Sequence, residues 1–220
     1  MSEPAFFSIF KTRKLVLSLF VFDSLIILLH WLYGNSHTLF HLDYEMNLPT
    51  FYQGMKLIVI GAVMLWVVVA RNLPKYIPLS LILIYLGIDE ALVLHENYEM
   101  MVYAVLPELW HLIEVLAGLI NYHSSRWVLY LLPTIIGVFA YVSYISVYTK
   151  KKLAKQFPFL IAGFFLFALV IILEILNSAP GLSWTEHQIL ITFEETAEMF
   201  GASFCAYFAY GLTQLKSQRR

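Results

Sequence analysis

Long apolar stretches separated by short polar segments make up most of this chain. A helix needs about 20 mostly apolar residues to cross roughly 30 Å of hydrocarbon. Six stretches are long enough, and they cover residues 15–33, 51–70, 77–95, 127–148, 159–176 and 188–212. The pattern predicts an all-α fold in which one integral-membrane domain, residues 1–220, forms a polytopic bundle of six transmembrane helices.

The basic residues orient this bundle. With six spans, twelve of the fourteen Lys and Arg fall on one side of the membrane: Lys11, Arg13, Lys14, Arg71, Lys75, Lys150, Lys151, Lys152, Lys155, Lys216, Arg219 and Arg220. The positive-inside rule makes that side cytoplasmic, so both termini are expected in the cytoplasm.

A seventh apolar stretch, residues 102–120, carries three ionisable residues, Glu108, His111 and Glu114. If this stretch also crossed the membrane, the lysines at 150–155 would lie on the opposite side from the basic N-terminal segment. We therefore predict that residues 102–120 form a re-entrant or interface-lying helix on the outer side, packed against protein.

Composition limits the class of protein and its partners. Soluble domains contain about 25% charged residues, whereas this chain has 13% charged and 60% hydrophobic residues. The lipid bilayer is the expected environment, no basic surface suits a nucleic acid, and a homo-oligomer or a membrane partner stays open. The single cysteine, Cys205, excludes an intrachain disulfide and a cysteine-rich metal site.

Acidic residues and histidines concentrate on the side away from these basic residues. Thirteen of the fifteen Asp and Glu, and all seven His, fall in outer loops or toward the outer ends and middles of spans. A charge within hydrocarbon costs about 2.5 to 3.5 kcal/mol on insertion scales, and a solvated face would carry charges of both signs. The distribution therefore indicates a polar site that opens to the outer side.

The first group of ionisable residues lies in the stretch LGIDEALVLHENYEM, residues 86–100. Read as one helix with 100° per residue, this stretch places Asp89 and Glu96 on one line. Glu90 and His95 then lie to either side of that line. Because polar side chains around so much of a helix cannot all face one neighbour, we expect protein or water to surround the end of the third span.

The second group lies in the last span. Its ionisable residues fall within an arc of about 100° on a helix: His187, Glu194, Glu195 and Glu198. Three carboxylates on one buried face repel each other unless they hold protons or a cation lies between them. We expect the two groups to be neighbours at the same depth and to form the two walls of one pocket.

The composition of this pocket predicts a metal site. Oxygen-rich sites with one to three imidazoles suit Fe, Mn or Zn, so we expect one or two divalent ions of these kinds. The expected ligands are Asp89, Glu90, His95, Glu96, Glu194, Glu195 and Glu198. Further candidates around them are Glu45, Glu108, His111, Glu114 and His187.

Two of these further candidates form a recognisable pair. Glu108 and His111 form Glu-x-x-His, the ligand pair of carboxylate-bridged di-iron and di-manganese bundles. Those bundles use two such pairs, whereas this chain has one. The same residues also fit an amphipathic interfacial helix with its polar side in water, and both interpretations stay open.

Three stretches together resemble an uncharacterised family of multi-pass bacterial membrane proteins: LDYEMNLPTFYQG, GIDEALVLHE and FEETAEMFGASF. An acidic-x-Glu…Pro-Thr stretch, an Asp-Glu-x4-His-Glu motif and a Glu-Glu-x2-Glu-x2-Gly motif recur there in this order. The matching positions are Asp43, Glu45, Pro49, Thr50, Asp89, Glu90, His95, Glu96, Glu194, Glu195, Glu198 and Gly201. The resemblance implies a protein of the bacterial cytoplasmic membrane and names no reaction.

Three classes of function follow from these residues. A metalloenzyme would use its metal to activate water against a lipid-like or small apolar substrate, or would use two metals for an oxidation. A proton- or cation-coupled transporter would use the same acids as a relay, although no acids or histidines continue that relay into the cytoplasmic halves of the spans. A structural membrane subunit with an internal polar network is the third class. The sequence alone assigns no catalytic residue.

Overall fold

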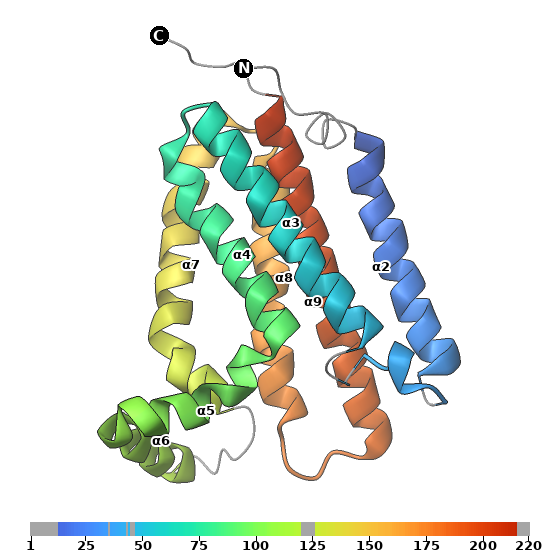
Figure 1. The fold of residues 1–220 in the computed structure, drawn as a ribbon, viewed down its shortest axis with the longest axis vertical. Coiled ribbons are helices and arrows are strands. Elements are labelled where there is room, and N and C mark those ends of the chain that lie inside the picture. Colours follow the sequence, from blue (N-terminus) through green and yellow to red (C-terminus); the bar gives the residue numbers. More distant parts are fainter. Residues whose placement is uncertain (1–12, 35, 43, 45–46, 120–125, 215–220) are drawn as a thin grey trace.

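The computed structural model of the protein describes residues 13–34, 36–42, 44, 47–119 and 126–214. These residues form helices and no strands, in the order α2 (Arg13–Tyr33), η1 (Thr38–Phe40), α3 (Leu48–Ala70), η2 (Pro74–Tyr76), α4 (Ile77–Leu92), α5 (Leu94–Val105), α6 (Pro107–Leu119), α7 (Trp127–Lys152), α8 (Phe157–Asn177) and α9 (Trp184–Thr213). The long helices lie side by side, and α5 and α6 lie across one end of the bundle (Figure 1). The all-α prediction is confirmed.

Four of the described helices contain segments long and apolar enough to cross a membrane: Val16–Tyr33, Leu48–Ala70, Trp127–Lys152 and Phe157–Asn177. A fifth candidate is the pair Pro74–Leu92 and Asn97–Val105, which meet at a bend of 104° and would form one broken span. Helix α9, the predicted sixth span, is not among them, because its acidic and small residues make it more polar than the others. The fold is therefore compatible with a membrane protein, but the predicted count of six spans is not confirmed.

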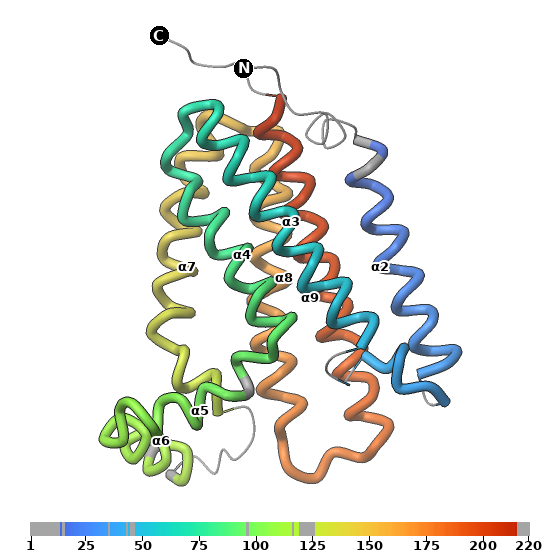
Figure 2. The backbone as a smooth tube through the Cα atoms, viewed as in Figure 1, coloured from blue at the N-terminus to red at the C-terminus, as the bar shows by residue number. Residues whose placement is uncertain are grey.

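The third predicted span ends earlier than its apolar pattern indicates. The sequence predicts a helix as far as His95, whereas α4 ends at Leu92 and Val93 has left-handed backbone angles, φ 52° and ψ 43°. This region is strongly disfavoured for a β-branched residue, and it breaks the helix. His95 and Glu96 therefore belong to α5, which turns away from α4 (Figure 2). The predicted single line from Asp89 to Glu96 is wrong.

The predicted helix over residues 102–120 is divided between two elements. Helix α5 ends at Val105 and α6 begins at Pro107. The break falls there because a proline disfavours helical backbone in the residue that precedes it. Neither helix reaches the roughly 20 residues that a membrane span needs, so both suit their position across the end of the bundle (Figure 1).

The two ends of the bundle carry opposite charges. One end of the bundle lies away from α5 and α6 (Figure 1). The N-terminus of α2 and the C-termini of α3, α7 and α9 lie there. Most described basic residues flank these helix ends: Arg13, Lys14, Arg71, Lys75, Lys150, Lys151, Lys152 and Lys155. Only Lys56 and Arg126, among the described Lys and Arg, lie elsewhere. We refer to this end as the basic end.

Close packing between neighbouring helices fixes the positions of α4 and α9, which carry the predicted site residues. The pairs α3–α4 and α8–α9 make the most extensive contacts among the described helices. Where α3 crosses α4, a Cβ atom added at Gly87 would lie 2.6 Å from the carbonyl oxygen of Gly54. The absence of a side chain therefore allows the two backbones to touch, and this contact fixes the position of Asp89 two residues farther along α4.

Candidate functional site

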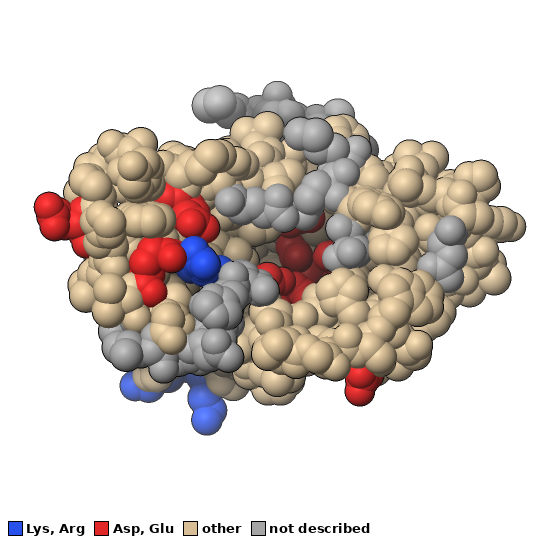
Figure 3. All heavy atoms as spheres, turned by 90° about the horizontal axis from the view of Figure 1, so that it is seen from below, with Lys and Arg blue, Asp and Glu red and all other residues tan. Residues whose placement is uncertain are grey.

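A cavity of about 1090 Å³ lies between α4, α5, α7, α8 and α9. Seven acidic residues line it: Asp89, Glu90, Glu99, Glu174, Glu194, Glu195 and Glu198. Seen from the end opposite the basic end, acidic side chains lie inside a hollow (Figure 3). Residues of both groups that the sequence singled out therefore line one cavity: Asp89, Glu90 and His95 from the first, and His187, Glu194, Glu195 and Glu198 from the second. We call the part of the cavity that the seven acidic residues line the acidic end.

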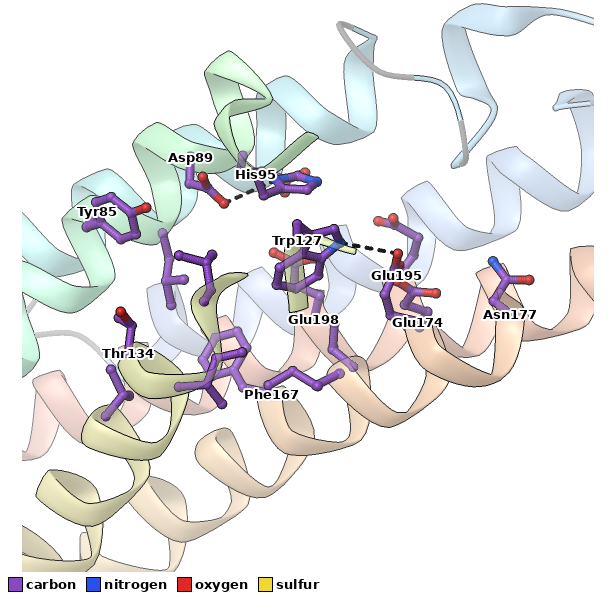
Figure 4. Close-up of a pocket in the computed structure, with 18 of the residues that line it drawn as sticks. Tyr85, Asp89, His95, Trp127, Thr134, Phe167, Glu174, Asn177, Glu195 and Glu198 are labelled. Atoms are coloured by element: carbon purple, nitrogen blue, oxygen red, sulfur yellow. Dashed lines mark hydrogen bonds and ion pairs between the residues drawn. The ribbon is translucent and has the colours of Figure 1, made fainter. Parts of the chain in front are cut away.

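The rest of the cavity is apolar and extends toward the basic end. Helices α4, α7 and α8 supply its walls: Leu81, Ile82, Leu86, Leu131, Ile135, Val138, Phe139, Phe164, Phe167, Val170 and Ile171. Tyr85 and Thr134 lie at one end of the close-up, and Glu195 and Asn177 lie at the other (Figure 4). At 1.5 Å per helical residue, the distance from the far end of this apolar arm to the acidic end is about 12 Å along α4 (Leu81 to Asp89) and about 18 Å along α7 (Phe139 to Trp127). The cavity thus complements, in shape and polarity, an amphiphilic molecule with a polar head group and a hydrocarbon tail.

The bend between α4 and α5 creates a pair at the acidic end. His95 Nδ1 lies 3.1 Å from Asp89 Oδ2, whereas residues six apart on a straight helix would point about 120° away from each other. The His95 ring also meets the Trp127 ring edge to face, with centroids 5.4 Å apart. The second carboxylate oxygen, Asp89 Oδ1, is buried and has no hydrogen-bond partner among the described residues. This oxygen is available to a ligand.

The two walls meet at Glu198. Its carboxylate interacts electrostatically with Asp89 and His95 on the opposite wall and with Lys56. Gln53 Nε2 donates a hydrogen bond to Glu198 Oε1 over 3.4 Å. Gln53 itself is fully buried, and its Oε1 lacks a partner within the described part of the chain. A second buried acceptor therefore lies beside the acidic end.

Glu174 joins this site from α8. Its carboxylate accepts a hydrogen bond from Trp127 Nε1 over 3.4 Å (Figure 4), and it is hydrogen-bonded to Glu194. Two carboxyl groups in contact must share a proton or hold a cation between them. Glu174 is absent from the predicted ligands, although a single acid near the end of an otherwise apolar helix is a signal that the sequence does carry.

The further metal-ligand candidates separate in the structure. His187 lines the cavity, and its Nδ1 lies 2.6 Å from Asn177 Oδ1. Glu114 instead binds Arg126, with 2.5 Å between its Oε1 and Arg126 Nη1. Glu108 and His111 are exposed on α6 and do not line the cavity. The Glu-x-x-His pair is therefore not part of the site, because its helix lies across the end of the bundle.

The predicted metal site is not supported by this geometry. The described residues contain no group of three or more His, Cys, Asp or Glu that could hold a metal ion. Zinc needs oxygen and nitrogen ligands at about 2.0 to 2.2 Å, so the donors would have to converge more closely. Asp43 and Glu45 lie outside the described residues, and Glu96 is described in its backbone only.

A separate ion pair lies buried next to Glu198. Lys56 Nζ lies 2.7 Å from Asp23 Oδ1, and the two side chains are 3% and 0% exposed. Tyr52 and Ser203 donate further hydrogen bonds to the Asp23 carboxylate, at 2.8 and 2.6 Å. Lys56 also donates to the carbonyl of Met199 at 2.9 Å. This network ties α2 to α3 and α9, and its two charges compensate each other.

Comparison with known proteins adds a family but no activity. Residues 15–212 match the family model of a domain of unknown function, DUF8692. This match fits the uncharacterised family that the sequence motifs predict. No curated protein and no solved structure matches the chain.

Proposed function

The chain belongs to the DUF8692 family, whose description assigns no function, and we propose a function from the site. The protein binds a membrane amphiphile whose head group carries a positively charged nitrogen. One observation carries the proposal, namely that an acidic end and an apolar arm share one cavity. The acidic end combines seven acidic residues with one arginine, Arg126. A cationic head group complements this charge, and a hydrocarbon chain complements the arm.

The chemistry of the acidic end suits an ammonium group. Trp127 presents an aromatic ring among the carboxylates, and a cation within about 6 Å of such a ring is attracted by its quadrupole. Asp89 Oδ1 supplies an acceptor that lines the cavity and lacks a partner within the described residues. An ammonium group would also lower the repulsion between Glu174 and Glu194. We assign no reaction to the bound molecule.

The same proposal includes a topology. Helix α9 would act as the sixth span, with its acids facing the cavity and not lipid, in the cytoplasmic membrane of a bacterium. The basic end would face the cytoplasm, as the positive-inside rule requires. The acidic end would then open to the outer side.

A binding pocket fits the packing better than a transport path does. Transport would need a polar path from Glu198 to the basic end. The polar network next to Glu198 ends at Asp23 and Ser203, and the α9 residues beyond it pack apolar side chains, Ala206 and Ala209, near α3. Within the described residues, this polar network therefore does not continue along α9 toward the basic end.

Binding of a cationic amphiphile tests the proposal. The full chain, in phosphatidylglycerol nanodiscs, is titrated with radiolabelled dodecyltrimethylammonium, and uptake by empty nanodiscs is subtracted. We expect saturable binding, and an increase of roughly tenfold or more in Kd for Glu198→Gln, because a contact to a charged group contributes about 1.5 to 3 kcal/mol. Dodecanol, the neutral analogue, should bind far more weakly.

The matched control is Glu108→Gln, which removes the same charge from an exposed residue outside the cavity. This variant should bind like the wild type. Equal Kd values for Glu198→Gln and Glu108→Gln would contradict a role of the acidic end.

Metal analysis tests the competing occupant. We expect protein purified without chelator to contain substoichiometric Fe, Mn and Zn by elemental analysis, because the described donors do not converge on one point. Stoichiometric metal that disappears in both His95→Ala and Glu195→Ala would overturn the amphiphile proposal in favour of a metal centre.

A further inference from the structure

The apolar arm has a gap in its wall between α4 and α7. Helix α4 packs against α3 and α5, and α7 packs against α8 and α5, but α4 and α7 are not among the described helix pairs that pack closely. Both nevertheless line the cavity, α4 through Leu81 and Tyr85 and α7 through Thr134 and Ile135. We call the gap at these four residues the α4–α7 window.

Contacts at both ends limit the window to the middle of the bundle. At the basic end, Tyr141 Oη donates to the carbonyl of Lys75 over 2.6 Å, and Tyr76 Oη lies 3.0 Å from Thr149 Oγ1. At the opposite end, the rings of His95 and Trp127 meet and α5 packs on α7. The bundle is therefore closed above and below the window, and open at the depth where hydrocarbon would surround it.

The edges of the window are suited to lipid. Leu81 is 51% exposed and Tyr85 is 40% exposed, which is unusual for large apolar side chains that line a cavity in a soluble protein but ordinary against hydrocarbon. Tyr85 lies on α4 and Thr134 lies on α7 at the same end of the close-up, away from Glu174 and Glu195 (Figure 4). The window thus leads into the apolar arm and not directly into the acidic end.

We propose that the hydrocarbon chain of the ligand enters sideways from the bilayer through the α4–α7 window and lies in the apolar arm. This inference rests on the proposed function, and it identifies the ligand as a molecule already dissolved in the membrane. A single extended alkyl chain matches the distance of about 12 to 18 Å from the far end of the arm to the acidic end, measured along the helices. The cationic group then lies at the acidic end, beside Trp127.

A tryptophan at the window tests this route. Ile135→Trp places a bulky ring in the window, whereas Ile136→Trp places the same ring on the adjacent residue, which is 59% exposed and does not line the cavity. The association rate constant and the Kd are measured for two probes, dodecyltrimethylammonium and tetramethylammonium, which lacks the chain. We expect Ile135→Trp to lower the association rate constant of the long probe roughly tenfold, because the ring blocks the route from the bilayer, and to raise its Kd as far as burial of the chain is also lost. Both constants of the short probe should stay at the wild-type values, and Ile136→Trp should change neither probe.

The possible outcomes separate the two proposals. An unchanged association rate constant of the long probe in Ile135→Trp, together with weaker binding of both probes to Glu198→Gln, would overturn the window and leave the binding function intact. Equal weakening of both probes by Ile135→Trp would also overturn it, because the ring would then act on the head group. Absence of saturable binding in the wild type would overturn both proposals.

A second pair of variants approaches the window from α4, in case Ile135→Trp does not fold. Leu81→Trp lies in the window, and Ile88→Trp lies on the same helix, 38% exposed and outside the cavity lining. Only Leu81→Trp should lower the association rate constant of the long probe. The same rate constant in both variants would overturn the window.

Discussion

Lys56→Met should lower the free energy of unfolding by about 3 to 5 kcal/mol, the cost of leaving one partner of a buried ion pair uncompensated. Asp23 is 0% exposed, and its carboxylate would keep the hydrogen bonds from Tyr52 and Ser203 but lose its only cation among the described residues. Methionine preserves most of the length of the lysine side chain, so the loss is electrostatic. Reversible unfolding of the purified protein in mixed micelles measures the change.

Two variants separate this effect from general sensitivity to lysine loss. Lys151→Met removes an exposed lysine at the basic end and should leave stability nearly unchanged. Adding Asp23→Asn to Lys56→Met removes the uncompensated charge and should restore most of the lost stability. If Lys56→Met unfolds at the same denaturant concentration as Lys151→Met, the pair does not hold α2 in place.

Gly87→Ala should destabilise the protein by about 1 to 3 kcal/mol, the usual cost of forcing an extra carbon into a packed contact. The new Cβ would lie 2.6 Å from Gly54 O and 2.7 Å from Ile58 N. Both are backbone atoms, so α3 and α4 must separate. Because Asp89 is two residues away, we also expect weaker binding of dodecyltrimethylammonium. Thermal unfolding followed by circular dichroism measures the first effect.

Gly137→Ala is the matched control on α7. A Cβ at Gly137 would meet nothing within 4 Å, and alanine is favoured over glycine in a helix by roughly 0.5 to 1 kcal/mol. We therefore expect equal or slightly higher thermal stability. A loss of stability in Gly137→Ala similar to that in Gly87→Ala would mean that close backbone contact is not the cause.

The site could be predicted from the sequence to the extent that its signals are local. Acids at helical spacing in the last span predict a polar face on α9, and Glu194, Glu195 and Glu198 do line the cavity. Helical periodicity needs no information about neighbouring helices. Hydropathy also reports the long helices directly, which is why the predicted bounds of α3 and α8 differ from the structure by only a few residues.

Features that depend on contacts between residues far apart in the sequence were predicted wrongly or were not predicted at all. The prediction of one helix through residues 77–95 assumed regular backbone, whereas Val93 adopts left-handed angles that apolar spacing does not reveal. Glu114 is a predicted metal ligand, whereas in the structure its Oε1 lies 2.5 Å from Arg126 Nη1. The Asp23–Lys56 pair joins residues 33 positions apart, and no local pattern links them.

The sequence by itself determined that this chain is all-helical, that its basic and acidic residues belong to opposite ends, and that acids of the third and last apolar stretches need a shared polar site. Each of these follows from the cost of placing charge or backbone polar groups in hydrocarbon, which acts on every residue wherever its neighbours are. Tertiary structure alone decided which acids meet, that Glu174 joins them, that His95 pairs with Asp89, and that the cavity continues into an apolar arm with the α4–α7 window in its wall. Those features depend on how closely helix backbones approach, as at Gly54 and Gly87, and on one strained residue, Val93, that turns His95 back toward Asp89.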